Sequence, residues 1–519
     1  MRSICNRWSI IQRSYMVFCK SICFSNILGR DHDEHVPRFR SDARDVTNEL
    51  RVRSTAREMW IAAGVLATLS AAANMASPLY PTYQQALGIS DLAVTLLYAT
   101  YALASVPSLL LFGPAADAFG RKPVLALGVT CAAIGTLPFA VAEHVAWLFA
   151  GRLLLGVALG LATGAGVAMM IEREPSGNRA RGSLLATLSF IGGTGAGPLL
   201  TGVLAQYAPA PTVLPFVVML AVLLAVGVSL AWVPGGVLVR GQRWRPTRPS
   251  VPHHLRTTFV VAGTTGFLGW AVVGIFLALL PSVAESVLGR PNLAVTGAII
   301  AALLLCSALA QPLAPRLLPH AAQTLGVTMI AVALGLLVSS YLPMFAQTPA
   351  SLVLLISAAV TAGMGHGMSY WGAAADVDAR TSEHRAAVTA SLYLLFYLGA
   401  GLPAVGVGLL TMILSLGTAV LLFSLVVALV TVLFLPVPSL VQTQIFATAP
   451  VPGPPERDRV REGATTGSAF AHSVIQSSWS HHHATLGYGN GAGSGSDGRS
   501  VHGSGASDKY GPDRSAARS

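Results

Sequence analysis

Hydrophobic residues along this chain gather in runs of about twenty residues between residues 59 and 435. Such a run matches the hydrocarbon thickness of a bilayer when it is helical. Helices are required there because lipid offers no partners to backbone amide and carbonyl groups. The pattern therefore predicts an all-α integral membrane protein with twelve transmembrane helices, at 59–82, 91–112, 123–142, 146–171, 183–207, 213–233, 257–281, 293–312, 323–343, 350–373, 386–408 and 411–435.

Polar segments divide these spans into two six-helix halves. The segment between spans 6 and 7 is rich in Pro and Gly and holds five arginines. The C-terminal segment is rich in Gly, Ser, Ala and Pro, and such a composition cannot bury a core. Residues 4–22 have a helical spacing of apolar residues, so a surface helix is an alternative to disorder there. We predict a basic, disordered N-terminal tail (1–56), a first half (57–234), a cytoplasmic linker (235–256), a second half (257–435) and a disordered C-terminal tail (436–519).

The net charge of +11 could indicate a nucleic-acid partner, but the basic residues lie in tails and short loops. Cytoplasmic loops of membrane proteins are enriched in Lys and Arg, which explains this placement better. The loops on one side offer only Arg290, so both termini are expected in the cytoplasm and the protein in the plasma membrane. The opposite loops hold Arg121, Lys122, Arg173, Arg179, Arg181, the five linker arginines, Arg316, Arg380 and Arg385.

The loop between spans 2 and 3 reads Gly-Pro-Ala-Ala-Asp-Ala-Phe-Gly-Arg-Lys over residues 113–122. It resembles motif A of the major facilitator superfamily (MFS), G-x-x-x-D-x-x-G-R-K, at every defining position. Glycine permits close helix approach and tight turns, and an arginine fork can hold a carboxylate. The resemblance implies a cytoplasmic latch between the halves, with Glu172 or Glu174 nearby, formed by Gly113, Asp117, Gly120, Arg121 and Lys122.

Spans 4 and 5 carry two further resemblances. Arg152 follows Gly151 early in span 4 and resembles the arginine of motif B, which the family links to proton coupling; an arginine that snorkels to the interface is the alternative. Span 5 resembles motif C, which is associated with antiporters, although Thr201 replaces one of its glycines. A merely structural Gly/Pro helix is the alternative there. The motif C positions are Gly193, Gly197, Pro198 and Gly202.

Many twelve-helix drug:proton antiporters, which this chain resembles, carry an acidic residue inside span 1, and this sequence has none there. His366, well inside span 10, is a candidate for coupling because histidine titrates near neutral pH; a packing or hydrogen-bonding residue is the alternative. Aromatic side chains suit apolar or cationic organic solutes, and they can equally face lipid. The candidate substrate-binding residues are Asn74, Trp270, Tyr370, Tyr393, Phe396 and Tyr397.

The resemblance implies a secondary active transporter that exports small organic molecules or drugs in exchange for protons. A metabolite or sugar uptake permease and a non-transporting receptor on the same fold remain alternatives. A membrane enzyme is disfavoured because no acid/base cluster or metal-ligand spacing is apparent in the sequence. We expect no cofactor and no metal, the proton gradient as the energy source, no nucleic-acid partner, and a monomer in the lipid bilayer.

Overall fold

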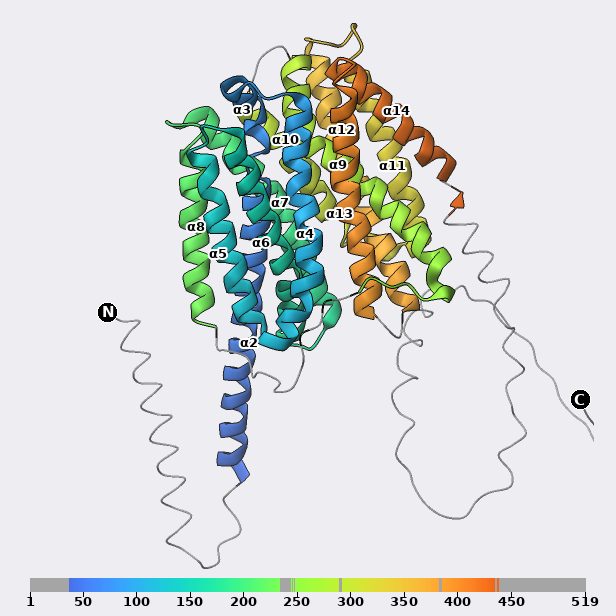
Figure 1. The fold of residues 1–519 in the computed structure, drawn as a ribbon. Helices are drawn as coiled ribbons and strands as arrows, with labels where there is room; N and C mark the ends of the chain where they lie inside the picture. The colour runs from blue at the N-terminus through green and yellow to red at the C-terminus, as the bar shows by residue number, and fades with distance from the viewer. Residues whose placement is uncertain are drawn as a thin grey trace, which may run out of the picture. The chain divides into compact units, whose positions relative to one another are not determined.

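The computed structural model describes residues 37–233, 244, 246, 248–288, 292–381, 385–434 and 436–437. All of them lie in one compact unit, which extends from Met1 to Ala449. Within the described residues twelve helical segments are long and apolar enough to cross a membrane, as the sequence predicts. Figure 1 shows them as a bundle of roughly parallel helices without strands among the described residues.

The first six spans are built from eight helical elements. The first span is interrupted at Ser77–Leu79, where Pro78 favours a short 3-10 turn, and it ends at Gly88 in the left-handed conformation (φ 63°) that favours glycine. The elements are α2 (Pro37–Asn74), η1 (Ser77–Leu79), α3 (Tyr80–Leu87), α4 (Asp91–Phe119), α5 (Arg121–Ala140), α6 (Val145–Glu172), α7 (Arg179–Tyr207) and α8 (Leu214–Ala231).

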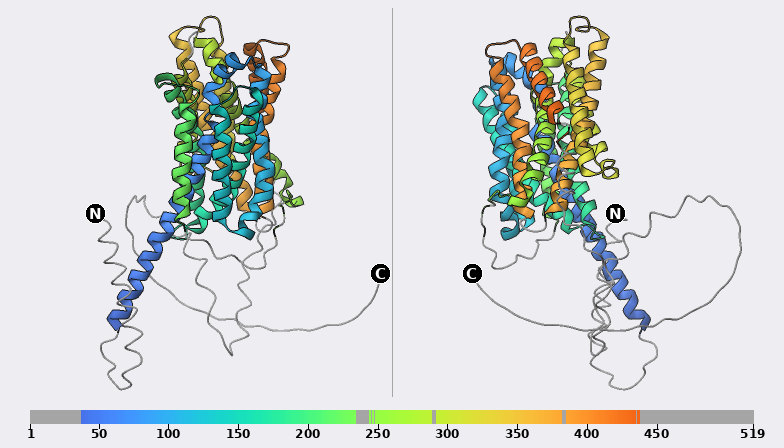
Figure 2. Two further views of the ribbon diagram at one scale, coloured as in Figure 1. Left: turned by 60° about the vertical axis from the view of Figure 1, so that its left-hand side comes forward. Right: turned by 90° about the vertical axis from the view of Figure 1, so that its right-hand side faces the viewer.

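The last six spans repeat this organisation after the linker. Their elements are η2 (His253–Leu255), α9 (Arg256–Leu288), α10 (Leu293–Ala310), η3 (Ala314–Arg316), α11 (Pro319–Ser340), α12 (Pro349–Arg380), α13 (Arg385–Leu410) and α14 (Leu416–Phe434). The two halves lie side by side in Figures 1 and 2. We call the end of the bundle where α4 meets α5 the loop end, and the opposite end the α3 end.

Helix α2 begins at Pro37, well before the predicted boundary at residue 57. Its first part extends past the bundle at the loop end (Figures 1 and 2). The described helix therefore includes residues 37–56 of the segment predicted as a basic N-terminal tail. Residues 38–57 contain six arginines, which favour helix without contributing apolar surface, and hydropathy alone does not detect such a helix. The possible surface helix at 4–22 lies outside the described residues.

Small residues make the same helix contact in both halves. A Cβ atom added to Gly156 of α6 would overlap the carbonyl oxygen of Tyr101 in α4. A Cβ atom added to Gly367 of α12 would overlap the carbonyl oxygen of Ser307 in α10. Helices associate in lipid through such close backbone approach. The pairs α4–α6 and α10–α12 are equivalent in the two six-helix repeats, as expected for two related halves.

The two halves are packed most tightly near the α3 end. There Gly202 of α7 leaves no room for a side chain beside the carbonyl oxygen of Leu293 in α10. The amide of Leu293 donates to the side-chain oxygen of Gln206 at 2.9 Å, and the hydroxyl of Ser282 donates to Gln84 at 3.4 Å.

Candidate transport site

Residues of the predicted motif A form an ion-pair cluster at the loop end. Gly120, with φ 94°, makes the turn between α4 and α5, and Arg121 is the first residue of α5. The guanidinium of Arg121 pairs with Asp117 of α4, and it binds Glu172 at the end of α6 at 2.7 Å. Arg121 and Glu172 both lie at helix ends whose dipole disfavours their charge. Their pairing therefore ties together three helices of the first half.

The position of this cluster corrects part of the prediction. The cluster includes Glu172 and not Glu174, because Glu174 accepts from Ser176 and from the amide of Asn178 in its own loop. The hydrogen bond from the Ser176 hydroxyl lowers the pKa of Glu174. All of the ion pairs found for Arg121 lie within the first half, so in this conformation the cluster does not join the two halves.

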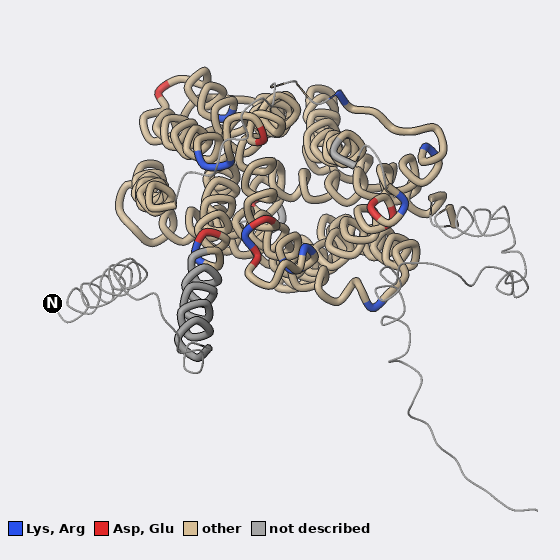
Figure 3. Tube along the Cα trace, turned by 90° about the horizontal axis from the view of Figure 1, so that it is seen from below, with Lys and Arg blue, Asp and Glu red and all other residues tan. Residues whose placement is uncertain are grey.

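Lys122 and Gly113 complete the motif in different ways. The ammonium group of Lys122 donates to the carbonyl oxygens of Ala231 and Val233, at 2.9 and 2.6 Å. A cation there stabilises the C-terminal end of α8. Gly113 faces Gly164 of α6, whose added Cβ atom would lie 3.1 Å from the Cα atom of Gly113. The predicted close approach to Gly113 is thus made by a helix of the same half. Figure 3 shows this end of the bundle with its Lys/Arg and Asp/Glu positions.

We expect Asp117→Asn to reduce transport about 10- to 100-fold, because one charge-assisted hydrogen bond contributes about 1.5–3 kcal/mol. The protein should still fold, since exposed ion pairs stabilise proteins by about 1 kcal/mol or less. Initial rates in membrane vesicles, normalised to the folded protein, measure the effect. Glu174→Gln removes a carboxylate from the neighbouring loop and should leave transport unchanged. Wild-type rates in Asp117→Asn would disprove a role for the cluster.

Arg152 lies completely buried among residues of the first half. It donates hydrogen bonds to the carbonyl oxygen of Ala73 and the hydroxyl of Tyr80. The carbon of its guanidinium lies 5.3, 5.5 and 5.6 Å from the ring centres of Tyr80, Tyr101 and Phe139. The alternative of an arginine that snorkels to the interface is therefore wrong. Burying a charge costs several kilocalories per mole unless nearby groups interact with it. The two hydrogen bonds and three aromatic rings around Arg152 supply such interactions.

The motif C glycines place α7 between two helices. Cβ atoms added to Gly193 and Gly197 would overlap the carbonyl oxygens of Ala67 and Ala71 in α2. Gly202 faces α10 of the other half, and a Cβ atom on Gly297 of α10 would overlap the carbonyl oxygen of Pro198. The pattern therefore has a packing role on two faces of one helix, and it lies directly at the contact between the halves.

Five of the six predicted substrate residues gather near the middle of the second half. The ring centres of Trp270 and Tyr370 are 6.4 Å apart, and those of Tyr370 and Phe396 are 5.3 Å apart. The hydroxyl groups of Tyr370 and Tyr393 lie within 3.1 Å. Tyr397 reaches Thr163 of the first half, with 3.4 Å between the hydroxyl oxygens. We call these residues the aromatic cluster: Trp270, Tyr370, Tyr393, Phe396 and Tyr397.

His366 joins the aromatic cluster. Its ring centre is 4.7 Å from that of Trp270, and its Nδ1 lies 2.7 Å from the hydroxyl of Ser307. Its Nε2 and the indole nitrogen of Trp270 are both buried without a hydrogen-bond partner among the described residues. No carboxylate is found against the ring in that part of the chain that the structure describes. The geometry fits the alternative of a hydrogen-bonding residue better than a titrating one.

Asn74 lies apart from the aromatic cluster. Its amide donates to the carbonyl oxygen of Ser70 at 2.9 Å, and its Oδ1 is buried without a partner among the described residues. It directly follows Ala73, which binds Arg152. Asn74 therefore belongs to the surroundings of Arg152.

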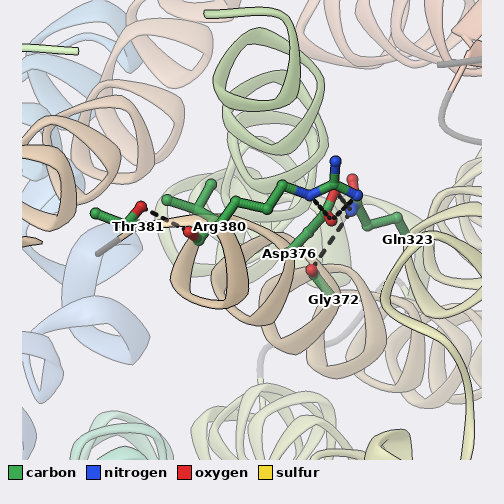
Figure 4. Close-up of polar contacts among 6 residues, drawn as sticks. Gln323, Gly372, Asp376, Arg380 and Thr381 are labelled. Carbon is green, nitrogen blue, oxygen red and sulfur yellow. Dashed lines mark hydrogen bonds and ion pairs between the residues drawn. The ribbon is translucent and has the colours of Figure 1, made fainter. Parts of the chain in front are cut away.

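A polar cluster near the loop end of the second half was missed by the sequence analysis (Figure 4). Asp376 of α12 pairs with Arg380 at 2.9 Å and accepts from the amide of Gln323 in α11 at 3.2 Å. The oxygen of Gln323 accepts from Thr265 of α9 at 3.1 Å. Three helices of the second half are thus joined, as α4, α5 and α6 are joined in the first. A glutamine at the start of the apolar run 323–343 was the available signal.

A hollow lies between α4 of the first half and α13 of the second half, and it is too small to hold an organic solute. The aromatic cluster is therefore packed against its neighbours and must open to admit an organic solute. The hollow is lined by Val106, Leu109, Leu110, Ala390, Leu394 and Tyr397.

Comparison with known proteins identifies the family. The sequence profile of the Major Facilitator Superfamily matches residues 62–404, which include motif A, Arg152 and the aromatic cluster. The chain belongs to the Major Facilitator Superfamily. Its twelve spans and two six-helix repeats are those of the MFS fold, and it is a multi-pass membrane transporter.

Individual relatives cover only part of this MFS chain. The MFS-type transporter traF of Penicillium crustosum is 35% identical over 162 residues, which are 30% of this chain and 33% of that protein. The vesicular acetylcholine transporter of Homo sapiens is 33% identical over 148 residues, which are 28% of this chain and 26% of that protein. The chain thus aligns with about a third or less of the length of these curated relatives.

Two solved structures share the fold. A bacterial homologue of the human lysosomal transporter Spinster, in an inward-facing and unoccupied conformation, superposes with a TM-score of 0.57 at 15% identity, over 75% of this chain and 96% of that chain. A variant of the nucleoside transporter NupG superposes with a TM-score of 0.53 at 16% identity, over 75% of this chain and 99% of that chain. Identities this low support the fold alone.

Proposed function

We propose that this protein couples the export of a small organic solute to the proton gradient by alternating access between its two halves. The observation that carries the proposal is the packing of α7, whose glycines and proline contact α2 on one face and α10 of the other half on the other face. A helix packed through close backbone contacts can shift without exchanging large side chains. The antiporter resemblance of motif C favours export over uptake.

Arg152 and the aromatic cluster supply the proposed coupling and substrate sites. Arg152 is fully buried and its charge is contacted by neutral groups among the described residues, so its interactions must be sensitive to any charge that arrives nearby. The aromatic cluster holds two unpartnered buried nitrogens, on Trp270 and His366, which can bind a polar group of a solute. Protons and the solute are the proposed partners, in a monomeric protein with no cofactor.

A transport assay in inverted membrane vesicles tests this function. Vesicles that contain the protein are incubated with a panel of fluorescent organic dyes under an inside-acid proton gradient. The proposal predicts uptake of at least one dye that stops when the gradient is collapsed and that does not occur in vesicles without the protein. Uptake that ignores the gradient would contradict coupling, and accumulation only in right-side-out vesicles would indicate import.

Both termini are proposed to lie in the cytoplasm of a plasma-membrane protein, because the loops at the loop end carry nearly all the basic residues of the short loops. A reporter enzyme that is active only outside the cell, fused after residue 440, should give no activity. The same reporter fused within the loop that contains Arg290, on the opposite side, should be active. The reverse pattern would invert the topology.

We expect His366→Gln to lower the transport rate and to keep the wild-type dependence on pH between about pH 6 and 7. Glutamine can replace the hydrogen bond to Ser307 but cannot titrate. The described groups around the ring are Trp270 of α9, Ser307 of α10 and Tyr370 of its own helix, and none of them carries a charge that would stabilise imidazolium. Transport rates across that pH range measure the effect. Loss of the pH dependence in the variant would restore His366 as a titrating residue.

A further inference from the structure

Arg152 is a buried cation without an anionic partner among the described residues. Its two hydrogen bonds go to a peptide carbonyl and a phenol, and its Nε–H has no acceptor. Two carboxylates nearer the α3 end do not pair with Arg152. Asp91 accepts from Gln84 at 2.8 Å, and Glu143 lies exposed in the loop between α5 and α6. Glu58 of the first span pairs with Arg173 at 3.1 Å. The positive charge is therefore not neutralised by the described chain.

The residues around Arg152 leave it able to bind a negatively charged group reversibly. Three aromatic faces, from Tyr80, Tyr101 and Phe139, surround the guanidinium and hold it by cation–π contact. These contacts position the charge but leave it uncompensated. A guanidinium has five donors in a planar fork, and Nε–H together with one terminal N–H matches the two oxygens of a carboxylate. The unused Nε–H is one of those two donors.

Arg152 is connected to the aromatic cluster through Tyr101. The ring of Tyr101 covers the guanidinium on one side, and its helix α4 packs against α13, the helix that carries Tyr397. Tyr397 of the second half in turn contacts Thr163 of the first half. Arg152 and the aromatic cluster therefore lie on opposite sides of the contact between the halves.

We infer that Arg152 binds the anionic group of the transported solute, so that the substrates are small organic acids with an aromatic or apolar body. The carboxylate takes two hydrogen bonds from Arg152, and the body lies against Tyr101, Tyr397 and the aromatic cluster. A cationic solute is disfavoured because it would meet an uncompensated positive charge in a site of low dielectric constant. The inference rests on the proposed transport function and names its substrate class.

Three probes of equal size and different charge test it. Purified full-length protein in nanodiscs of neutral lipid is titrated with benzoate, benzamide and benzylamine, and binding is measured by calorimetry. Benzoate is expected to bind at least about tenfold more tightly than the other two, a difference of about 1.4 kcal/mol. Arg152→Gln should remove this preference while benzamide binding stays the same. Arg316→Gln, which removes an exposed arginine at the loop end, should keep it.

The order of the three probes in the wild type decides the question even if Arg152→Gln does not fold. Equal or tighter binding of benzylamine, failure of benzoate to bind, or a benzoate preference that persists in Arg152→Gln would overturn the inference. The vesicle assay separates the two proposals. Proton-driven dye transport without a carboxylate preference would support the proposed function and contradict this inference. A carboxylate preference without proton-driven transport would support binding of organic acids at Arg152 and contradict the proposed function.

Discussion

Replacing Gly197 by valine is expected to remove nearly all folded transporter. A Cβ atom at this position would overlap the carbonyl oxygen and the carbonyl carbon of Ala71 in α2. Because the overlapping atoms belong to the backbone, no side-chain rotation can relieve the contact, and α2 and α7 must separate. Overpacking of this kind costs about 1–3 kcal/mol or more. The amount of monodisperse protein in fluorescence-detected size-exclusion chromatography measures the effect.

Gly192 provides the matched control for this substitution. It lies on the same helix, and no heavy atom is found within 4 Å of an added Cβ atom. Gly192→Val adds the same side chain to the same helix, and it should keep normal amounts of folded protein. If both variants folded equally well, the backbone contact between α2 and α7 would not hold the first half together.

Replacing Arg152 by lysine is expected to reduce transport on the order of a hundredfold, even though the positive charge is kept. Each hydrogen bond that involves a charged group contributes about 1.5–3 kcal/mol. A lysine ammonium group cannot bind Ala73 and Tyr80 as a planar fork, and it contacts aromatic faces less well than a guanidinium. Gradient-driven transport per folded protein is the quantity to measure.

Arg316→Lys is the control for the arginine-to-lysine change itself. Arg316 lies exposed in η3, so a lysine there should leave the transport rate unchanged. Full transport by Arg152→Lys would show that only the charge matters at this position. It would also remove the argument that the donor geometry of Arg152 is used.

The sequence predicts the helices well because long apolar runs have one physical solution in a bilayer. It also predicts the pairing of Asp117 and Arg121 with Glu172 or Glu174 nearby, and the structure has Glu172 in this place. It does not predict the tyrosines around Arg152. Tyr80, Tyr101 and Phe139 come from three separate helices, and their convergence depends on helix rotation, which hydropathy does not fix.

The polar cluster of the second half shows the same limit. Asp376 and Arg380 are four residues apart on one helix, so their pairing follows from helical geometry. The contact of Asp376 with Gln323 depends instead on how α11 packs against α12. The prediction of helix ends is also limited where a helix is polar. The start of α2 at Pro37 lies in a polar segment that has no hydropathy signal.

A reversible cross-link between the halves tests alternating access most directly. Gln84 of α3 and Ser282 of α9 face each other across the halves at the α3 end, with 3.4 Å between their side-chain oxygens. The double variant Gln84→Cys, Ser282→Cys is reconstituted in liposomes, and gradient-driven solute transport is measured after oxidation and again after reduction. The account predicts that oxidation stops transport, that reduction restores it, and that neither treatment affects the single variants. Undiminished transport by the fully cross-linked protein would contradict it.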